Sequence, residues 1–379
     1  MQYPHVHCNL DQSVCQVTTG MAEINAAATI MALALSPKFD LRSTYWLLAG
    51  IAGVNPKYAT LGSVALSRFS VQVALQYEFD AREVPDNFTT GYFPIGSYGP
   101  GQYPASIYGT EVMELNEALR DAAYGFALNT TLSDDMNSTL YRQKYKGNGK
   151  GDGIGSDSSE YLAAIETPSV VRCDSATSDV YFSGKLLSEA FENVTTLMTN
   201  GSGQYCMTAQ EDNAVLEVLL RLTIENRVDF TRVILMRTGK QGSWSWLMTD
   251  LLTNIKKGAD FDRPPPELSP FLHLTNGSQN GFDIAIANIY NAGIEIVKGI
   301  LRNWDCTFKK GIVPTNYVGD IFGSLGGTPD FGRGSITGGV PVKPDGQSGD
   351  IGRRQVARGR QARRRNSSRK RREVAHCVV

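Results

Sequence analysis

Short glycine-rich and polar clusters recur along the chain where an apolar strand pattern stops. Residues 19–28 (TGMAEINAAA) join a strand pattern to an Ala-rich helix pattern, and residues 49–53 (AGIAG) close another strand. Glu211 stands just before a helix pattern, and Arg237 ends an apolar strand. Glycine lets backbone approach a ligand closely, and parallel sheets bind ligands at the carboxyl ends of their strands. The spacing therefore predicts a ligand site built from several strand ends.

These clusters must be positioned by the strands and helices that alternate along the chain. We predict strands at residues 14–18, 44–49, 63–75, 169–172 and 233–237, and helices at residues 24–35, 111–128, 185–198, 210–223 and 282–301. Strand, glycine turn, helix and strand in this order are typical of a sheet with helices on its faces. Residues 146–159, rich in Gly, Ser and Asp, are predicted to form a surface loop.

Charge divides the chain into two parts. Residues 353–372 hold ten Arg and one Lys, and without these cations and Glu373 the net charge is near −11. An acidic body does not favour nucleic-acid binding, so no nucleic-acid partner is expected for it. Residues 332–379 are Gly-rich and then basic, without apolar periodicity. We predict that they are a disordered, solvated extension, with nuclear targeting or polyanion binding as the functional alternative.

Sequons and cysteines bear on the compartment. Seven Asn-X-Ser/Thr sequons favour a secreted or lumenal chain; they begin at Asn87, Asn129, Asn137, Asn193, Asn200, Asn276 and Asn366. Of six Cys, Cys8 with Cys15 and Cys173 with Cys206 are disulfide candidates, while a free buried thiol is an equal alternative for any single Cys. The first residues lack the apolar region of a signal peptide. Either the sequons are idle in a cytosolic protein, or the true start is missing.

Membrane and metal signals are weak. The longest apolar runs, residues 26–36 and 45–54, are about half of the roughly 20 residues that a membrane helix needs, so no transmembrane helix is predicted. The cluster His5-Val6-His7-Cys8 is similar to half of a metal site, but no second cluster accompanies it. We expect neither a metal nor a cofactor.

The order of the glycine and polar clusters resembles the nucleoside phosphorylase/nucleosidase superfamily. The matching segments are TGMAEINAAA (19–28), AGIAG (49–53), LGSV (61–64), residues 173–182, QEDNA (210–214) and Arg237-Thr238. Longer blocks resemble the fungal purine nucleoside permease family. They are QYEFDARE (76–83), DNFTTGYFP (86–94), YGTE (108–111), YCMTAQEDN (205–213), DFDRPPP (260–266) and residues 316–332. The resemblance covers roughly residues 4–332.

This resemblance implies the fold and the function. The expected fold is a single three-layer α/β domain of nucleoside phosphorylase type over residues 1–332, in which helices flank a central mixed sheet. The expected function is the handling of purine nucleosides, in nucleoside uptake and metabolism, under the family name of permease. Transport would need capture of nucleoside outside the cell or a membrane partner. The alternative is a purine nucleosidase, or less readily a phosphorylase, and the oligomeric state stays open.

The resemblance also implies roles for individual residues. Cleavage of a nucleoside requires an acid for the purine, a carboxylate on the ribose hydroxyls and an aromatic face for the base. Asp260 takes the place of the acid, with Asp262 as a rival, and Glu211 matches the glutamate that accepts hydrogen bonds from ribose. The remaining substrate-binding candidates are Asn213, Tyr181, Phe182, Gly20, Gly50 and Gly53, of which the aromatic residues would stack on the base.

Each of these residues has a simpler structural alternative. Asp260 can be a loop carboxylate beside Arg263, and Glu211 can be a first-turn acid favoured by the helix dipole. Tyr181 and Phe182 can belong to the core.

Three departures from the superfamily pattern weaken an enzymatic interpretation. Residues 50–53 offer no hydroxyl for phosphate, which argues against phosphorolysis. The chain starts after the expected first strand and loop, so we expect an N-terminal truncation that would also have removed a signal peptide. About nineteen residues, 240–258, separate Arg237-Thr238 from Asp260 and show no family likeness. We interpret them as an insert from a retained intron, and the tail 333–379 as a segment of similar origin.

Overall fold

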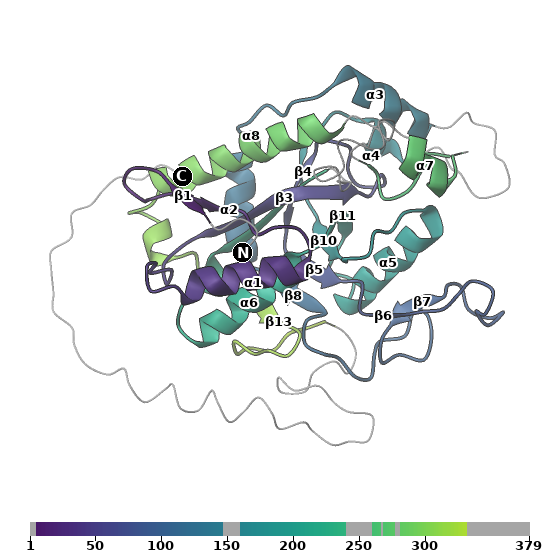
Figure 1. Cartoon of the computed structure of the whole chain (residues 1–379), viewed down its shortest axis with the longest axis horizontal. Helices are drawn as coiled ribbons and strands as arrows, with labels where there is room; N and C mark the ends of the chain where they lie inside the picture. The colour runs from purple at the N-terminus through teal and green to yellow at the C-terminus, as the bar shows by residue number, and fades with distance from the viewer. Residues whose placement is uncertain (1–4, 147–159, 240–259, 267, 277–280, 332–379) are drawn as a thin grey trace.

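The structure, a computed structural model, describes residues 5–146, 160–239, 260–266, 268–276 and 281–331. Its centre is a sheet in the order β13-β8-β5-β10-β11-β3-β12-β4-β9 (Figure 1). The strands are β3 (Trp46–Val54), β4 (Val64–Ser67), β5 (Phe69–Gln72), β8 (Val112–Glu114), β9 (Val170–Arg172), β10 (Asp174–Thr177), β11 (Tyr205–Ala209), β12 (Val233–Gly239) and β13 (Gly319–Asp320). Two hairpins lie outside it: β1 (Val6–Cys8) with β2 (Cys15–Val17), and β6 (Gln76–Glu78) with β7 (Tyr92–Pro94).

The sheet is mixed, because two groups of strands run in opposite directions. β12 is parallel to β3 over seven residue pairs, from Val233 opposite Trp46 to Gly239 opposite Ala52. β5, β10 and β11 are parallel to one another, but β11 is antiparallel to β3. β11 therefore begins beside the carboxyl end of β3 and runs toward the middle of that strand, and the carboxyl ends of β5 and β10 lie on the same side of the sheet as that of β11.

Helices cover both faces of this sheet, so the predicted three-layer α/β class with a central mixed sheet is confirmed. On one face α1 (Glu23–Leu35) packs on α6 (Asp212–Ile224), and on the other α2 (Glu117–Ala127) packs on α8 (Gly281–Arg302) (Figure 1). α5 (Lys185–Met198) contacts β7 and β11. Shorter helices are α3 (Met136–Arg142), α4 (Leu162–Ile165) and α7 (Pro270–Asn276), with 3-10 turns at Gln143–Lys146, Phe230–Arg232 and Phe308–Lys310. Apolar clusters fill the space between sheet and helices on each face.

Several predicted elements are confirmed, and four are corrected. The single strand predicted at 63–75 is two strands, β4 and β5, which lie apart in the sheet. The glycine cluster 49–53 is not a turn: it lies inside β3, because β12 pairs along the strand as far as Ala52. The helix predicted at 111–128 begins only at Glu117, after strand β8, because the buried Asn116 side chain caps it by accepting a hydrogen bond from the Leu119 amide at 3.2 Å. The strand predicted at 14–18 forms as β2, but in a separate hairpin rather than in the main sheet.

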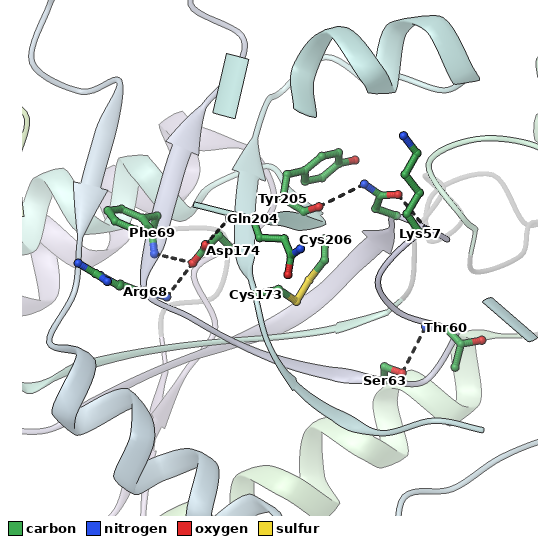
Figure 2. The surroundings of a disulfide bond; sticks show 11 residues. Lys57, Thr60, Ser63, Arg68, Phe69, Cys173, Asp174, Gln204, Tyr205 and Cys206 are labelled. Atoms are coloured by element: carbon green, nitrogen blue, oxygen red, sulfur yellow. Dashed lines mark hydrogen bonds between the residues drawn. A yellow bond between two sulfur atoms is a disulfide. The ribbon is translucent and has the colours of Figure 1, made fainter. Parts of the chain in front are cut away.

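Both candidate cysteine pairs are bonded in the structure. Cys8–Cys15 closes the β1–β2 hairpin, and Cys173–Cys206 joins the residue before β10 to β11. Figure 2 shows that second disulfide beside Asp174, whose carboxylate accepts hydrogen bonds from the amides of Arg68, Phe69 and Gln204 at 2.8–2.9 Å. The disulfide joins the amino ends of β10 and β11, and the Asp174 carboxylate holds them against the β4–β5 junction.

The segments interpreted as an insert (240–258) and as a tail (333–379) lie outside the described residues, and so does the predicted loop (146–159) apart from Lys146, which ends a 3-10 turn. The residues that flank the first segment are informative. Gly239 pairs with Ala52, and Phe261 forms a parallel bridge with Val54, so β12 stops and resumes along the same edge of β3. Without residues 240–258, only Ala259 and Asp260 would join Gly239 to Phe261, as in a strand with a one-residue β-bulge. The insert itself stays a prediction.

Candidate functional site

A buried ion pair crosses the middle of β3 at Gly50. Arg237 of β12 pairs with Gly50 in the sheet register, and its guanidinium passes over that glycine toward the start of α6. There Nη2 lies 3.3 Å from Glu211 Oε1, and Nε lies 3.1 Å from Asp212 Oδ2. A Cβ on Gly50 would overlap the guanidinium. Gly50 therefore makes room for an arginine side chain, and the ligand contact that the resemblance implies for it stays a prediction.

The carboxylates on either side of Arg237 stabilise its charged form. Burial alone would lower the pKa of Arg237, but the negative charges of Asp212 and Glu211 outweigh that effect and raise it. Asp212 also accepts a hydrogen bond from the Ser175 hydroxyl at 2.7 Å, so both of its oxygens are engaged. Glu211 remains partly accessible, and burial raises its pKa above the ordinary value. Glu211 is thus the member of this group that is able to accept hydrogen bonds from a ligand.

Asn213, the next polar residue of α6, is used inside the protein. Its Oδ1 accepts hydrogen bonds from the Ser70 and Thr177 hydroxyls, at 2.7 and 2.8 Å, and its Nδ2 donates to the Thr110 carbonyl at 2.7 Å. These partners belong to β5, to β10 and to the turn before β8. The geometry gives Asn213 a structural position, joining strands beneath the site.

Two further carboxylates lie near Glu211 that sequence reasoning missed. Glu23, the first residue of α1, accepts a hydrogen bond from Gln72 Nε2 at 2.7 Å, and its amide donates to Asp179 Oδ1 at 3.2 Å. Burial raises the pKa of Glu23, and the negative charges of Asp179 and Glu211 raise it further. Glu23 stands in the glycine motif and could have been noticed there, whereas no local signal marks Asp179.

Gly20 forms the turn that delivers α1 to this place. Its φ is 86°, in the left-handed region that favours glycine, and the Thr29 hydroxyl donates to the Thr19 carbonyl at 3.0 Å. The turn directs the amino end of α1, with Glu23, toward the carboxyl ends of β5 and β10. Gly20 therefore has the turn geometry that its motif predicts.

Asp260 and Tyr181 form a second part of the site. The Asp260 side chain is buried, and its carbonyl accepts a hydrogen bond from the Val54 amide at 3.3 Å, which fixes it at the carboxyl end of β3. Tyr181 is 41% exposed. Burial of part of this side chain raises its pKa, and the negative charge of Asp260 adds to the shift. The structure thus places an accessible aromatic ring next to a buried acid.

Asp262, Phe182 and Gly53 are directed into the interior. Asp262 is fully buried, lies 2.7 Å from Arg263 Nε and accepts a hydrogen bond from the Tyr205 hydroxyl at 2.6 Å. Phe182 packs edge-on against Phe191, with 4.4 Å between ring centroids. The Gly53 amide donates to the Thr208 hydroxyl at 2.8 Å. Of each neighbouring pair, the structure brings Asp260 and Tyr181 to the site and leaves Asp262 and Phe182 in the core.

One loop and one strand join the two parts. Asp179 and Tyr181 belong to the same loop after β10, which ends where the Gly184 amide donates to the Asp262 carbonyl at 3.0 Å. Along β3, Arg237 lies opposite Gly50 and Phe261 opposite Val54. Four residues of strand correspond to about 13 Å. Glu211 and Asp260 therefore lie at opposite ends of a stretch of about that length.

Other features lie apart from this site. Among the described residues, no three His, Cys, Asp or Glu side chains are grouped as a metal site, and Cys8 of the His5–Cys8 cluster is bonded to Cys15. A shallow cavity of about 350 Å³ lies beside Cys173 and is lined by Tyr58, Tyr124, Val170, Val171, Arg172 and Gln204. None of its lining residues is a site candidate.

One described helix, α8, is long and apolar enough to cross a membrane by length and composition. In this fold it packs Ile284, Ala292 and Ile296 into the core. A core helix of this length passes the same test.

Comparisons with known proteins agree on one family. The family model described as "Purine nucleoside permease (NUP)" matches residues 1–244 and 249–313. A purine nucleoside permease from Candida albicans is 43% identical over 340 residues, which cover 88% of this chain and 76% of that protein. A probable purine nucleoside permease from Schizosaccharomyces pombe is 36% identical over 310 residues, 80% of each chain.

Solved structures with lower similarity were also found. A 5'-methylthioadenosine/S-adenosylhomocysteine nucleosidase from Colwellia psychrerythraea in complex with adenine is 13% identical, with a TM-score of 0.38 over 77% of this chain and 80% of that chain. Futalosine hydrolase from Helicobacter pylori is 12% identical, with a TM-score of 0.38 over 79% and 83%. The family model and the two permease relatives cover most of the sequence, and the chain belongs to the purine nucleoside permease family.

Proposed function

We propose that this chain binds purine nucleosides in the site between Glu211 and Asp260 and takes part in their uptake. The observation that carries the proposal is the pairing of the buried Asp260 carboxyl with the accessible Tyr181 ring, at the other end of the site from the partly accessible Glu211. Tyr181 offers a stacking face for the purine, and Asp260 offers a hydrogen-bonding group for its edge. Glu211 accepts hydrogen bonds from the ribose hydroxyls. The names of the relatives support the same ligand class.

The charges around Glu211 favour a neutral ligand over a phosphorylated one. Glu23, Asp179 and Asp212 all lie within electrostatic range of Glu211, and Arg237 is already paired with Glu211 and Asp212. The amino end of a helix ordinarily attracts anions, but at α1 the Glu23 amide is taken by Asp179. A phosphate group would meet a net negative field here. We therefore propose nucleosides, not nucleotides, as the ligands, and no phosphate co-substrate.

Purine nucleosidase activity is the second candidate. It is favoured by the position of Asp260, because a buried carboxyl beside a stacking face for the purine can serve as a general acid. In that reaction Asp260 would donate a proton to the departing purine, and Glu211 would hold the ribose while water attacks C1′. The two candidates share a site and differ only in whether the glycosidic bond is broken.

Equilibrium titration with adenosine, inosine and guanosine tests the binding proposal on the full chain. Glu211→Gln removes charge-assisted hydrogen bonds, which are worth about 1.5–3 kcal/mol, and should weaken binding by at least tenfold. Asp260→Asn should weaken it as well, whereas Asp305→Asn, at a carboxylate that is 85% exposed, should not. Equal affinity of all four proteins would refute the site.

Chromatography of the same mixtures decides between the two candidates. Release of free base without phosphate, lost in Asp260→Asn, would establish the nucleosidase. Saturable binding without free base would support capture for transport.

We further propose that the intact protein is secreted or displayed at the cell surface, where a membrane partner completes transport. Asn87, Asn137 and Asn193 head sequons and are exposed, and two disulfides are formed, as an oxidising compartment allows. Expression through a eukaryotic secretory route should give a product that loses mass on treatment with an N-glycosidase. An unchanged mass would contradict the proposed compartment.

A further inference from the structure

A buried tyrosine–histidine pair lies behind the segment that carries Asp260. Tyr141 of α3 is 3% exposed, and His273 of α7 is fully buried. The Tyr141 hydroxyl oxygen lies 2.7 Å from His273 Nδ1, and His273 Nε2 lies 2.9 Å from the Phe261 carbonyl oxygen. A line of polar contacts therefore runs from α3 through α7 to the residue that follows Asp260.

The direction of each hydrogen bond follows from the chemistry of the groups. A carbonyl oxygen only accepts, so His273 Nε2 carries the proton and donates to Phe261. Burial lowers the pKa of His273, which favours the neutral imidazole. In that form Nδ1 accepts, so the Tyr141 hydroxyl must be the donor. Tyr141 thus holds His273 in the tautomer that is able to bind the Phe261 carbonyl.

This carbonyl is the one that β3 does not engage. Val54 of β3 donates to the Asp260 carbonyl at 3.3 Å and accepts from the Asp262 amide at 2.8 Å. These bonds use residues 260 and 262, and His273 takes the carbonyl of Phe261 between them. The segment is therefore held by hydrogen bonds to β3 and to His273, as an inner strand is held by its two neighbours.

Tyr141 also lies within electrostatic range of the Asp260 side chain. Burial raises the pKa of Tyr141, and the negative charge of Asp260 raises it further. The pair therefore touches the backbone beside Asp260 and lies near its carboxyl group.

We propose that Tyr141 and His273 are positioning residues that hold Asp260 in the orientation the nucleoside site requires. The proposal rests on the proposed function of Asp260 in that site. It assigns a role to two residues that lie 132 positions apart in the sequence and that no motif joins.

The structure offers a close control for Tyr141. Tyr145 is also fully buried, its hydroxyl donates to the Arg263 carbonyl at 2.6 Å, and its ring centroid lies 4.3 Å from that of Phe261. Tyr141→Phe and Tyr145→Phe each remove one buried hydroxyl from the same aromatic cluster. Only the first breaks the chain to His273.

His273 itself allows a test by rescue. His273→Gln keeps an N–H close to the place of Nε2, and His273→Asn keeps a polar group only near the place of Nδ1. We expect Tyr141→Phe and His273→Asn to weaken adenosine binding about three- to tenfold, as the loss of one hydrogen bond implies. His273→Gln and Tyr145→Phe should stay within about twofold of the unchanged protein.

Hydrogen exchange of the full chain measures, without any ligand, how firmly the segment that carries Asp260 is held. Peptides covering residues 260–266 should exchange faster in Tyr141→Phe and His273→Asn than in the unchanged protein, His273→Gln or Tyr145→Phe. Equal exchange in all five would overturn the inference, and so would equal adenosine affinity of Tyr141→Phe and Tyr145→Phe. If the unchanged protein binds no nucleoside, the proposed function fails, while the exchange rates still decide whether the pair holds the segment.

Discussion

Replacing Gly50 by alanine should lower the free energy of unfolding and weaken nucleoside binding, because it adds one methyl group at a crowded position. The Cβ would occupy the space of the Arg237 guanidinium, and Arg237 is fixed at its base by strand pairing on both sides, with Gly50 of β3 and Ala65 of β4. The guanidinium must therefore leave its position over the glycine. Its bonds to Asp212 and Glu211 would be lost or distorted.

The size of the effect follows from the burial of the partners. The Asp212 side chain is fully buried and that of Arg237 is 6% exposed. Separating such a pair leaves an uncompensated buried charge and costs about 3–5 kcal/mol. Asp212 would keep the hydrogen bond from the Ser175 hydroxyl, which is already made. We therefore expect the free energy of unfolding to fall by about 3–5 kcal/mol.

Urea denaturation followed by circular dichroism, with adenosine titration alongside, measures both consequences. Gly125→Ala in α2 is the matched control: a Cβ there meets nothing within 4 Å, and replacing a helical glycine should stabilise the protein by about 0.5–1 kcal/mol. If Gly50→Ala lowers the unfolding free energy by less than about 1 kcal/mol and leaves affinity unchanged, the reasoning is wrong, because Arg237 then has a second position of equal energy.

Three further predictions concern the site and the insert. Burial raises the pKa of Glu211 above its ordinary value of 4.5, so Glu211 should lose its charge as the pH falls through that raised pKa, and nucleoside affinity should fall with it. Adenosine titrations at a series of pH values should show a flatter affinity profile for Glu211→Gln. Asp179→Asn should improve binding of adenosine monophosphate relative to adenosine several-fold, and an unchanged ratio would contradict the charge argument for selectivity. Deleting residues 240–258 should leave a folded protein with an equal or higher melting temperature, because the β3 partners of Gly239 and Phe261 are only two positions apart. A deletion variant that does not fold would show that the segment is not an insert. Sequencing the transcript across the segment tests the intron origin.

Local patterns predicted most of the elements. The helix expected at 185–198 is α5, and the helix expected at 24–35 is α1 with one residue added. Amphipathic spacing and flanking glycines are local properties, so they can be recognised in the sequence without knowledge of the fold. The errors arose where a distant partner overrode the local signal. Residues 49–53 look like a turn, but pairing with β12 makes them strand.

The candidate site shows the same division. Asp260, Glu211 and Tyr181 were named from the sequence, with Asp262 as a rival of Asp260 and Phe182 as an alternative to Tyr181. Tyr181 and Phe182 are adjacent and point in different directions, and only the surrounding elements decide which of them meets solvent. Asp262 lies two positions from Asp260, and its distant partner Tyr205 together with Arg263 engages it in the core.

Local periodicity and ordered motifs were enough to predict the α/β class, the order of its elements, the candidate cysteine pairs and the family. Long-range packing was needed to show that Arg237 reaches Glu211 over Gly50, that Glu23 and Asp179 add to the acidity of the site, and that Tyr141 and His273 lie behind Asp260. The contacts of Glu23 with Asp179 and of Tyr141 with His273 join residues more than a hundred positions apart. The contact of Arg237 with Glu211 over Gly50 follows from the mixed pairing of β3 with β11 and β12, which no local pattern specifies.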